Sequence, residues 1–258
     1  MNIPTLNALI IGPSGHGKSW LASTTPPPRL IIDLEGRAKY TPNGRQAVFW
    51  DGITDPMALE RSPTRTYILR AQSLAQLDTG RQWLRSGKHP FKSVSVDSLM
   101  EAQIRVAEQI RPGLQSFRIQ DFGDLNRHMQ VFVREIKDMT EVPETGIRCA
   151  VFIAGAKRDE DGFIRPLMQG QISRNTPYWM DIVGYLERVR LENGQVVRRL
   201  WLDQRPENDL EVKDGLDYVT TKFGAAVINP SIEAMYNAVV EGDAAARQAR
   251  LEPREGAQ

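Results

Sequence analysis

Three glycines, one lysine and a final serine are spaced at fixed positions in the octapeptide Gly12-Pro13-Ser14-Gly15-His16-Gly17-Lys18-Ser19. This order fits G-x-x-x-x-G-K-[ST], the pattern of a phosphate-binding loop (P-loop), whose glycines let backbone N–H groups curl around a polyphosphate. The lysine places its charge on the β- and γ-phosphates, and the last hydroxyl coordinates Mg²⁺. An apolar strand, residues 6–11, precedes the loop, and a helical run that starts at Trp20 follows it. That context favours a nucleotide site at Gly12–Trp20 over a glycine-rich turn that binds nothing.

A metal-bound triphosphate needs a second protein ligand, normally an aspartate that ends a strand near the loop. Asp97 meets this requirement, because it ends the apolar run 91–97 and is followed by Ser98. We therefore expect Ser19 and Asp97 to hold Mg²⁺. The alternative is that Asp97 only caps the helix that follows.

Hydrolysis of a triphosphate also needs a group that orients the attacking water. Glu35 ends a second apolar strand, at the sheet edge where ligands gather in open α/β folds. Glu101 competes with it, but its place three residues after Ser98 is also that of a capping box. We favour Glu35 as the base and assign Asp33, on the same strand face, a structural role.

The composition is that of an ordinary globular protein, and 258 residues suffice for one sizeable α/β domain. The formal net charge of +1 predicts no overall attraction to polyanions, so nucleic acid must be held by a local basic patch. The three histidines lack the spacing of a zinc site. No apolar run is long enough for a membrane helix and no signal peptide is apparent, so we expect a cytoplasmic protein without a membrane partner.

The cysteine and most of the tryptophans lie in sequence contexts that predict a role in packing and not in catalysis or binding. The single cysteine, Cys149, lies in an apolar run, which excludes an internal disulfide and predicts a buried thiol. Four tryptophans adjoin apolar segments, and we expect them to pack rather than to stack on bases. They are Trp20, Trp83, Trp179 and Trp201, whereas Trp50 lies in an irregular segment, residues 37–65, and cannot be placed.

The order of elements predicts an α/β fold: a mainly parallel sheet covered by helices, with an antiparallel hairpin toward the C-terminus. We expect one core over residues 1–241, and a frayed helix or flexible tail over 242–258, where little can be buried. The expected strands are residues 6–11, 30–34, 67–69, 94–97 and 149–154. One expected helix starts near residue 73, and the others span residues 99–110, 123–141 and 232–240. The expected hairpin pairs residues 185–191 with 196–202.

Three segments together resemble the core of RecA-type ATPases: the P-loop, the strand Ile31–Glu35 and the strand Val94–Ser98. In that family the second-strand glutamate is the catalytic base, and the strand matching Cys149–Ala154 lies beside the P-loop strand. The resemblance covers roughly residues 5–203. It implies a RecA-like ATP hydrolase that uses Mg²⁺, with Lys18 and Glu35 as catalytic residues.

A looser resemblance, over residues 165–170 and 181–186, is to the small RecA-core ATPases of bacteriophages. Some of these act as single-strand annealing recombinases; a phage-encoded protein would work in the host cytoplasm. Two features depart from recombinases. Ala154-Gly155-Ala156 stands where they carry a polar sensor, usually glutamine, and the N-terminal segment that joins their subunits has no counterpart. Filament formation by that route is therefore not expected.

RecA-type cores hold DNA with two loops, which match roughly residues 109–122 and 157–176. Basic residues lie there beside Phe117 and Phe122, as suits a single strand with its phosphates and stacking bases. Asp159–Asp161 would oppose phosphate binding locally, and for Arg111 and Arg118 ordinary solvated surface is an equal alternative to DNA contact. Lys157 and Arg158 are also candidate fingers for a neighbour's γ-phosphate. The candidate DNA contacts are Arg111, Arg118, Lys157, Arg158, Arg165 and Arg174.

The resemblance implies an ATPase of phage-type DNA recombination or annealing, which binds single-stranded DNA. We expect a homo-oligomer with ATP near subunit interfaces, and a single-strand DNA-binding protein is a further candidate partner. The alternative is a nucleotide-dependent assembly or loading factor that acts on a protein and touches DNA little. A small-molecule kinase fits less well, because no lid-like arginine cluster stands out.

Overall fold

The protein is represented by a computed structural model, which describes residues 4–113, 117–203 and 210–251. Its strands are β1 (Leu6–Gly12), β2 (Arg29–Asp33), β3 (Val48–Trp50), β4 (Thr66–Arg70), β5 (Ser93–Asp97), β6 (Cys149–Arg158), β7 (Ile164–Pro166), β8 (Ile182–Arg190), β9 (Val196–Trp201), β10 (Lys213–Asp214) and β11 (Ala226–Ile228). Its helices are α1 (Lys18–Ala22), α2 (Leu74–Ser86), α3 (Leu99–Ile110), α4 (Ile119–Asp138), α5 (Ile172–Trp179), α6 (Tyr218–Phe223) and α7 (Ile232–Leu251), with short 3₁₀ turns η1 (Ala38–Tyr40), η2 (Gly44–Gln46), η3 (Pro56–Ala58) and η4 (Pro143–Thr145).

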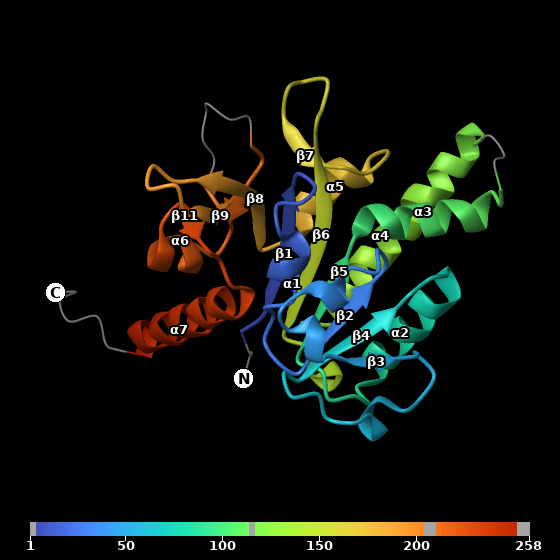
Figure 1. Cartoon of the computed structure of the whole chain (residues 1–258), viewed down its shortest axis with the longest axis horizontal. Coiled ribbons are helices and arrows are strands. Elements are labelled where there is room, and N and C mark those ends of the chain that lie inside the picture. Colours follow the sequence, from blue (N-terminus) through green and yellow to red (C-terminus); the bar gives the residue numbers. More distant parts are fainter. Residues whose placement is uncertain (1–3, 114–116, 204–209, 252–258) are drawn as a thin grey trace.

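One sheet runs through the molecule in the order β11-β9-β8-β1-β6-β5-β2-β4-β3 (Figure 1). From β8 through β1 to β3 neighbouring strands are parallel, which confirms the predicted mainly parallel sheet. The strand that contains Cys149 lies beside the P-loop strand, as the RecA-type resemblance implied. Strand β1 is buried along its whole length, because helices cover both faces of a parallel sheet.

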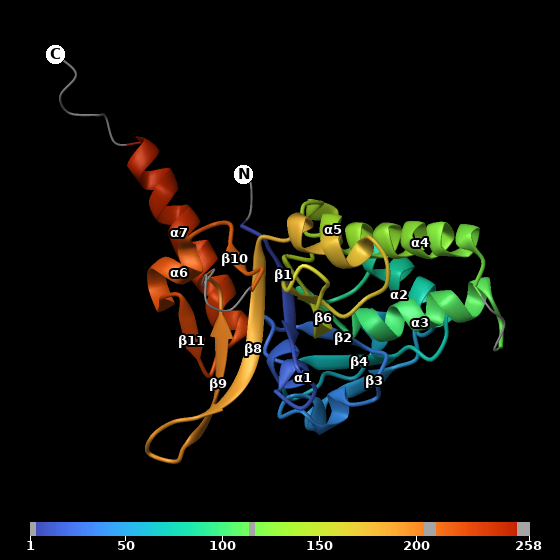
Figure 2. The same cartoon turned by 90° about the horizontal axis from the view of Figure 1, so that it is seen from above.

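The two faces are covered by different helices (Figure 2). Alternate residues of β1 point to opposite faces, so Leu9 belongs to the core cluster that α2, α3, α4 and α5 cover, whereas Ile10 belongs to the cluster under α1, α6 and α7. The apolar stripe predicted for residues 123–141 is the buried side of α4, although that helix begins earlier, at Ile119. Helix α7 continues to Leu251, well beyond the predicted end at residue 240. Residues 252–258 of the predicted tail lie outside the described residues, and the division into core and tail stays a prediction.

The predicted hairpin is confirmed, since β8 and β9 pair antiparallel and β11 extends this end of the sheet. A second antiparallel pair was not expected. Strand β6 continues to Arg158 and turns back into β7, because the Asp159 carboxylate accepts hydrogen bonds from the backbone of Asp161 and Phe163. The expected loop 157–176 is therefore wrong as a loop, because β7 and the start of α5 lie within it. In the other expected loop, residues 114–116 lie outside the described residues.

Packing accounts for the cysteine and the tryptophans. Cys149 is fully buried, as predicted, and burial raises the pKa of its thiol. Trp201 is buried, Trp83 and Trp179 pack against the core, and Trp50 enters the core from β3, which adds an edge strand inside the irregular segment. Among the described residues, none of the helices has the length and apolar character that a membrane-crossing segment needs.

Candidate active site

The P-loop joins β1 to α1 at the edge of the sheet where β2 and β5 also end, beside the middle of β6. Strand register places this edge, because Gly12 pairs with Gly155, and Asp97 pairs with both Asp33 and Ile153. A cavity of about 980 Å³ opens there. Its lining brings together most of the predicted nucleotide and metal residues, namely Gly12, Pro13, Ser14, Gly15, Gly17, Lys18, Ser19, Trp20, Glu35 and Asp97.

The P-loop is shaped for a polyphosphate. Gly17 has a φ of 95°, in the left-handed region that favours glycine, and a Cβ there would lie 2.2 Å from Nε of Arg198. Lys18 Nζ donates hydrogen bonds of 2.8 Å to the carbonyls of Gly12 and Pro13, which hold the ammonium over the loop. His16 faces elsewhere, since its Nδ1 accepts a hydrogen bond from the backbone N–H of Arg188. Nucleotide contact by the His16 ring stays a prediction.

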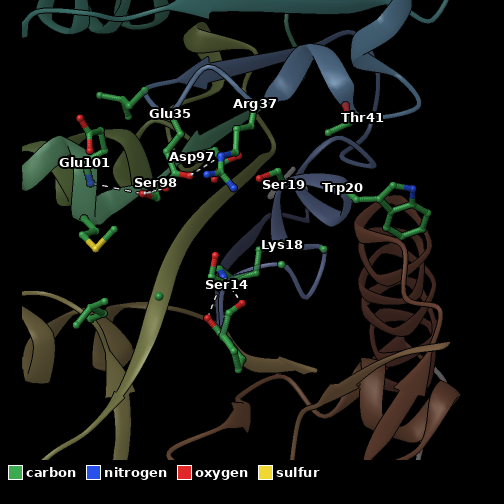
Figure 3. A pocket seen from close by; sticks show the side chains of 18 of the residues that line it. Ser14, Lys18, Ser19, Trp20, Glu35, Arg37, Thr41, Asp97, Ser98 and Glu101 are labelled. Atoms are coloured by element: carbon green, nitrogen blue, oxygen red, sulfur yellow. Dashed lines mark hydrogen bonds and ion pairs between the residues drawn. The ribbon is translucent and has the colours of Figure 1, made fainter. Parts of the chain in front are cut away.

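The lysine and the candidate metal ligands share one electrostatic environment. Burial lowers the pKa of Lys18, while the carboxylates of Asp97 and Glu35 act in the opposite direction. Burial also raises the pKa of Asp97 to about 6, although a hydrogen bond with Ser19 and the charge of Lys18 oppose this shift. The groups are therefore close enough for each charge to act on the others (Figure 3).

Ser19 and Asp97 fit a divalent metal ion. Asp97 is only 2% exposed, and its Oδ2 has no hydrogen-bond partner within the described structure. An unpartnered buried carboxylate oxygen is costly unless a cation or donor reaches it. Carboxylate and hydroxyl oxygens are ligands that Mg²⁺ prefers. The structure thus brings together the two residues that the sequence assigned to Mg²⁺.

Glu35 lies beside this pair at the end of β2. The Ser98 hydroxyl donates a 2.7 Å hydrogen bond to its Oε1, and Nε of Arg37 lies 3.9 Å from its Oε2. Ser98 also caps α3 by accepting a hydrogen bond from the Glu101 backbone. The glutamate that we favoured as base is therefore oriented from two sides at the rim of the cavity.

The two competing carboxylates have other partners. Glu101 lines the cavity, but it forms a 2.7 Å ion pair with Arg105 in the next turn of α3. Asp33 accepts hydrogen bonds from the backbone N–H groups of Gly36, Arg37 and Ala38, and so holds the turn after β2. Its position fits the structural role that we expected.

Four arginines of the cavity lining were not predicted: Arg37, Arg70, Arg105 and Arg198. Arg37 could have been found from its place two residues after Glu35. Arg198 carried no such signal, because it comes from β9, far along the chain. Its guanidinium stacks on the ring of Trp20 at 4.5 Å from the centroid. Trp20 thus packs against an arginine of the site itself.

The candidate DNA residues fall into two groups. Lys157, Arg158, Arg165 and Arg174 line one cavity of about 360 Å³ with Asp159 and Glu160. Arg165 is 9% exposed and forms ion pairs with Asp159 and Glu211, which argues against a phosphate contact. Arg174 is 60% exposed and lies 3.4 Å from Asp161, whereas Lys157 donates to the carbonyl of Met168.

The other group lies where α3 ends and α4 begins. Arg111 forms a 2.7 Å ion pair with Asp121, and the ring of Phe117 packs against that of Phe122. Arg118 is exposed. DNA contact by any of the six cations stays a prediction.

The model of a family described as "AAA domain" matches residues 5–214. Among solved structures, a KaiC-like protein from the hyperthermophilic archaeon Pyrococcus horikoshii is similar at 14% identity and a TM-score of 0.42, covering 88% of this chain and 92% of that one. An ATPase from the type III secretion system of pathogenic bacteria is similar at 12% identity and a TM-score of 0.43, covering 70% of this chain and 51% of that one. Among curated proteins, none matches the chain in sequence.

Proposed function

The chain belongs to the AAA domain family, and we propose that it hydrolyses ATP with the help of Mg²⁺. The observation that carries this proposal is the meeting of Lys18, Asp97 and Glu35 at one cavity, with an unpartnered buried oxygen on Asp97. A site that only bound phosphate would not need an oriented carboxylate beside the metal ligands. The proposal assigns each of the three groups a separate task.

In this mechanism the P-loop amides hold the phosphates, and Lys18 turns from the carbonyls of Gly12 and Pro13 to the β- and γ-phosphates. Ser19 and Asp97 would hold Mg²⁺, which when bound neutralises charge on the phosphate oxygens. Glu35 accepts a proton from the attacking water, while the hydrogen bond from Ser98 fixes its orientation. These residues bind, orient and remove a proton without a covalent intermediate on the protein.

Phosphate release from ATP tests the assignment. Lys18→Ala should abolish turnover and weaken ATP binding, whereas Glu35→Gln should stop hydrolysis but leave binding intact, because the amide keeps the size and loses the base. Glu60→Gln, a change at an exposed carboxylate outside the cavity, is the matched control and should match the wild type. Chelation of Mg²⁺ should also stop turnover. Normal turnover in Glu35→Gln would contradict the base assignment.

We further propose that this ATPase acts on single-stranded DNA in recombination or annealing, as a homo-oligomer with ATP near subunit interfaces. One group of cations and exposed aromatic rings supports this proposal. Lys157, Arg158 and Arg174 meet at one cavity that Arg165 also lines. The ring of Phe163 lies under the guanidinium of Arg165 and is 40% exposed, and Tyr178, whose charge acts on Arg165, is 75% exposed. Cations and exposed rings suit the phosphates and bases of a single strand.

Binding of a labelled oligonucleotide, with and without an ATP analogue, tests this second step. A protein that tracks phosphates must lose affinity steeply between about 50 and 200 mM salt. Absence of binding at low salt would contradict the DNA proposal and favour the alternative, an assembly or loading factor with a protein partner. A single-strand DNA-binding protein could be added to the same assay, to test it as a further partner.

A further inference from the structure

Arg37 brings a guanidinium from the same chain to the cavity that the P-loop lines. Its side chain lines the cavity and is 65% exposed, and its Nε lies 3.9 Å from Oε2 of Glu35. Figure 3 shows this side chain directed toward Asp97 and Glu35. Its charge also acts on Lys18, whose pKa it helps to lower. The guanidinium therefore lies within electrostatic reach of both the phosphate-binding lysine and the candidate base.

The backbone that carries Arg37 is held in place. Asp33 accepts hydrogen bonds of 2.7, 3.2 and 3.2 Å from the N–H groups of Gly36, Arg37 and Ala38. Turn η1 begins immediately afterwards. A fixed backbone under a long, exposed side chain lets the guanidinium move by rotation of its side chain alone.

The other three arginines of the cavity contact groups other than Glu35. Arg70 lies 3.6 Å from Asp33, and Arg105 forms ion pairs with Glu101 and Glu108. Arg198 is stacked on Trp20. Of the four, Arg37 is the one whose described ion pair is with the candidate base. The two finger candidates from the sequence, Lys157 and Arg158, do not line this cavity.

We propose that Arg37 is a catalytic residue that stabilises the transition state of ATP hydrolysis within its own subunit. This inference rests on the proposed ATPase function. In the step, the oxygen of water forms a bond to the γ-phosphorus, and the bond from that phosphorus to the β–γ bridging oxygen breaks. ADP leaves with the electron pair of the broken bond, and the proton of the water passes to Glu35. Arg37 donates its N–H groups to the γ-phosphate oxygens while the charge on them is redistributed.

The long distance between Arg37 and Glu35 fits this catalytic role. A pair of 3.9 Å between partly exposed groups is weak, so a phosphate oxygen can replace the carboxylate as acceptor. Release of Glu35 from the arginine would then free its Oε2 to accept a proton. Removal of a positioned arginine from a phosphoryl-transfer site costs about 10³- to 10⁵-fold in turnover. For a partly exposed side chain we expect a loss of roughly 100-fold or more.

The first experiment compares turnover and binding in Arg37→Ala, Arg37→Gln and Arg37→Lys. The first two variants should lower kcat roughly 100-fold, with ADP affinity changed little, and Arg37→Lys should recover only part of the loss. Binding of ADP with aluminium fluoride, which imitates the transferred phosphoryl group, should weaken in Arg37→Ala. Lys39→Ala removes a neighbouring cation of η1 that does not line the cavity, and it should behave as the wild type.

A second experiment asks in which subunit Arg37 acts. Arg37→Ala and Glu35→Gln are mixed under conditions that allow subunits to exchange. If both residues serve the site of their own chain, every site in the mixture lacks one of them, and activity stays at the low level of the separate variants. Restored activity would show that Arg37 reaches a neighbour's site and would overturn the proposal.

The outcomes separate this inference from the function on which it rests. A wild type that binds ATP but releases no phosphate would contradict the proposed ATPase itself. An active wild type with unchanged kcat in both Arg37→Ala and Arg37→Gln would overturn the role of Arg37 alone. Melting temperatures of the variants show whether a loss of turnover is caused by misfolding. If Arg37→Ala misfolds, the kcat of the more conservative variant Arg37→Gln tests the role of Arg37.

Discussion

The hydroxyl of Ser98 donates a 2.7 Å hydrogen bond to Oε1 of Glu35, and so joins the residue that caps α3 to the candidate base on the loop after β2. We predict that Ser98→Ala lowers kcat roughly tenfold with little change in KM, because Glu35 keeps its charge and loses its orientation. Loss of the cap should also lower the free energy of unfolding by about 1 kcal/mol. Steady-state kinetics and chemical denaturation measure the two effects.

Ser73→Ala is the matched control for this change. Ser73 caps α2 by accepting a hydrogen bond from the backbone of Gln76, and it does not line the cavity. The control should therefore lose a similar amount of stability and keep full turnover. Equal kcat values in the two variants would show that the Ser98–Glu35 hydrogen bond has no part in hydrolysis.

The residues that the sequence predicted to meet at one site, and that line one cavity in the structure, are those that follow from local spacing. Lys18 and Ser19 lie in a motif that fixes their backbone, and Asp97 and Glu35 follow short apolar strands. Parallel strands end at a common edge, so the strand pattern alone predicted that these residues meet. The architecture of the sheet was predictable for the same reason.

Contacts between distant segments were not predictable in this way. Arg198 reaches the P-loop only because β9 folds back along β8, and that pairing does not show which cations face the loop. The sequence predicted Arg165 as a DNA contact because it does not show that Glu211 lies beside it. Trp50 could not be placed, because its strand β3 has only three residues and depends on β4 for its pairing.

The stacked pair of Arg198 and Trp20 predicts an effect on nucleotide affinity. The guanidinium contacts the wall of the P-loop at Gly17, and its Nε is buried without a hydrogen-bond partner in the described structure. Arg198→Ala should weaken binding of ATP and ADP roughly tenfold and leave kcat nearly unchanged, since the described contacts of the arginine are with Trp20 and Gly17 and not with Glu35. Titration calorimetry with each nucleotide measures the change.

Arg199→Ala serves as the comparison for Arg198→Ala. Arg199 is the next residue of β9, stacks over Trp201 and forms a 2.6 Å ion pair with Glu187, so it packs on the hairpin and not on the P-loop. This variant should lose stability and keep its nucleotide affinity. A similar loss of affinity in both variants would mean that the hairpin as a whole, and not the stacked arginine, supports the P-loop.

The two arginines Arg165 and Arg174 should respond in opposite ways. Arg165 is buried between Asp159 and Glu211, so Arg165→Ala leaves two carboxylates without their partner and should cost about 3 kcal/mol of stability. Arg174 is exposed, and Arg174→Ala should leave stability within about 0.5 kcal/mol of the wild type. If DNA binds here, Arg174→Ala should reduce its affinity and the slope of its salt dependence. Denaturation measures the stability of both variants, and oligonucleotide titration measures their affinity for DNA. A stable Arg165→Ala variant with reduced DNA affinity would show that Arg165 contacts DNA and does not hold the fold.

The buried His89 should make the free energy of unfolding depend on pH. Its Nδ1 accepts a hydrogen bond from the backbone N–H of Phe91, and its Nε2 therefore carries the proton and donates to the carbonyl of Leu84. Burial lowers the pKa of this imidazole, because it removes water from the charged form, and the hydrogen bond to Leu84 opposes this shift. A second proton would also have to face the N–H of Phe91. The unfolded chain gains that proton near pH 6.5, whereas the folded chain gains it only at lower pH. The stability that neutral His89 contributes is thus complete above pH 6.5 and is lost as the pH falls toward its folded pKa.

The variant His89→Gln isolates this contribution, because glutamine does not titrate. It should be less stable than the wild type at pH 7.5, and the difference between the two should shrink as the pH falls below about 6.5. Carboxylates also titrate at low pH, but they are common to both proteins and cancel in the comparison. His128→Gln, at an exposed position of α4, should follow the wild-type profile. Thermal denaturation at a series of pH values measures all three proteins, and a constant difference between wild type and His89→Gln would show that His89 is protonated equally in the folded and unfolded chains.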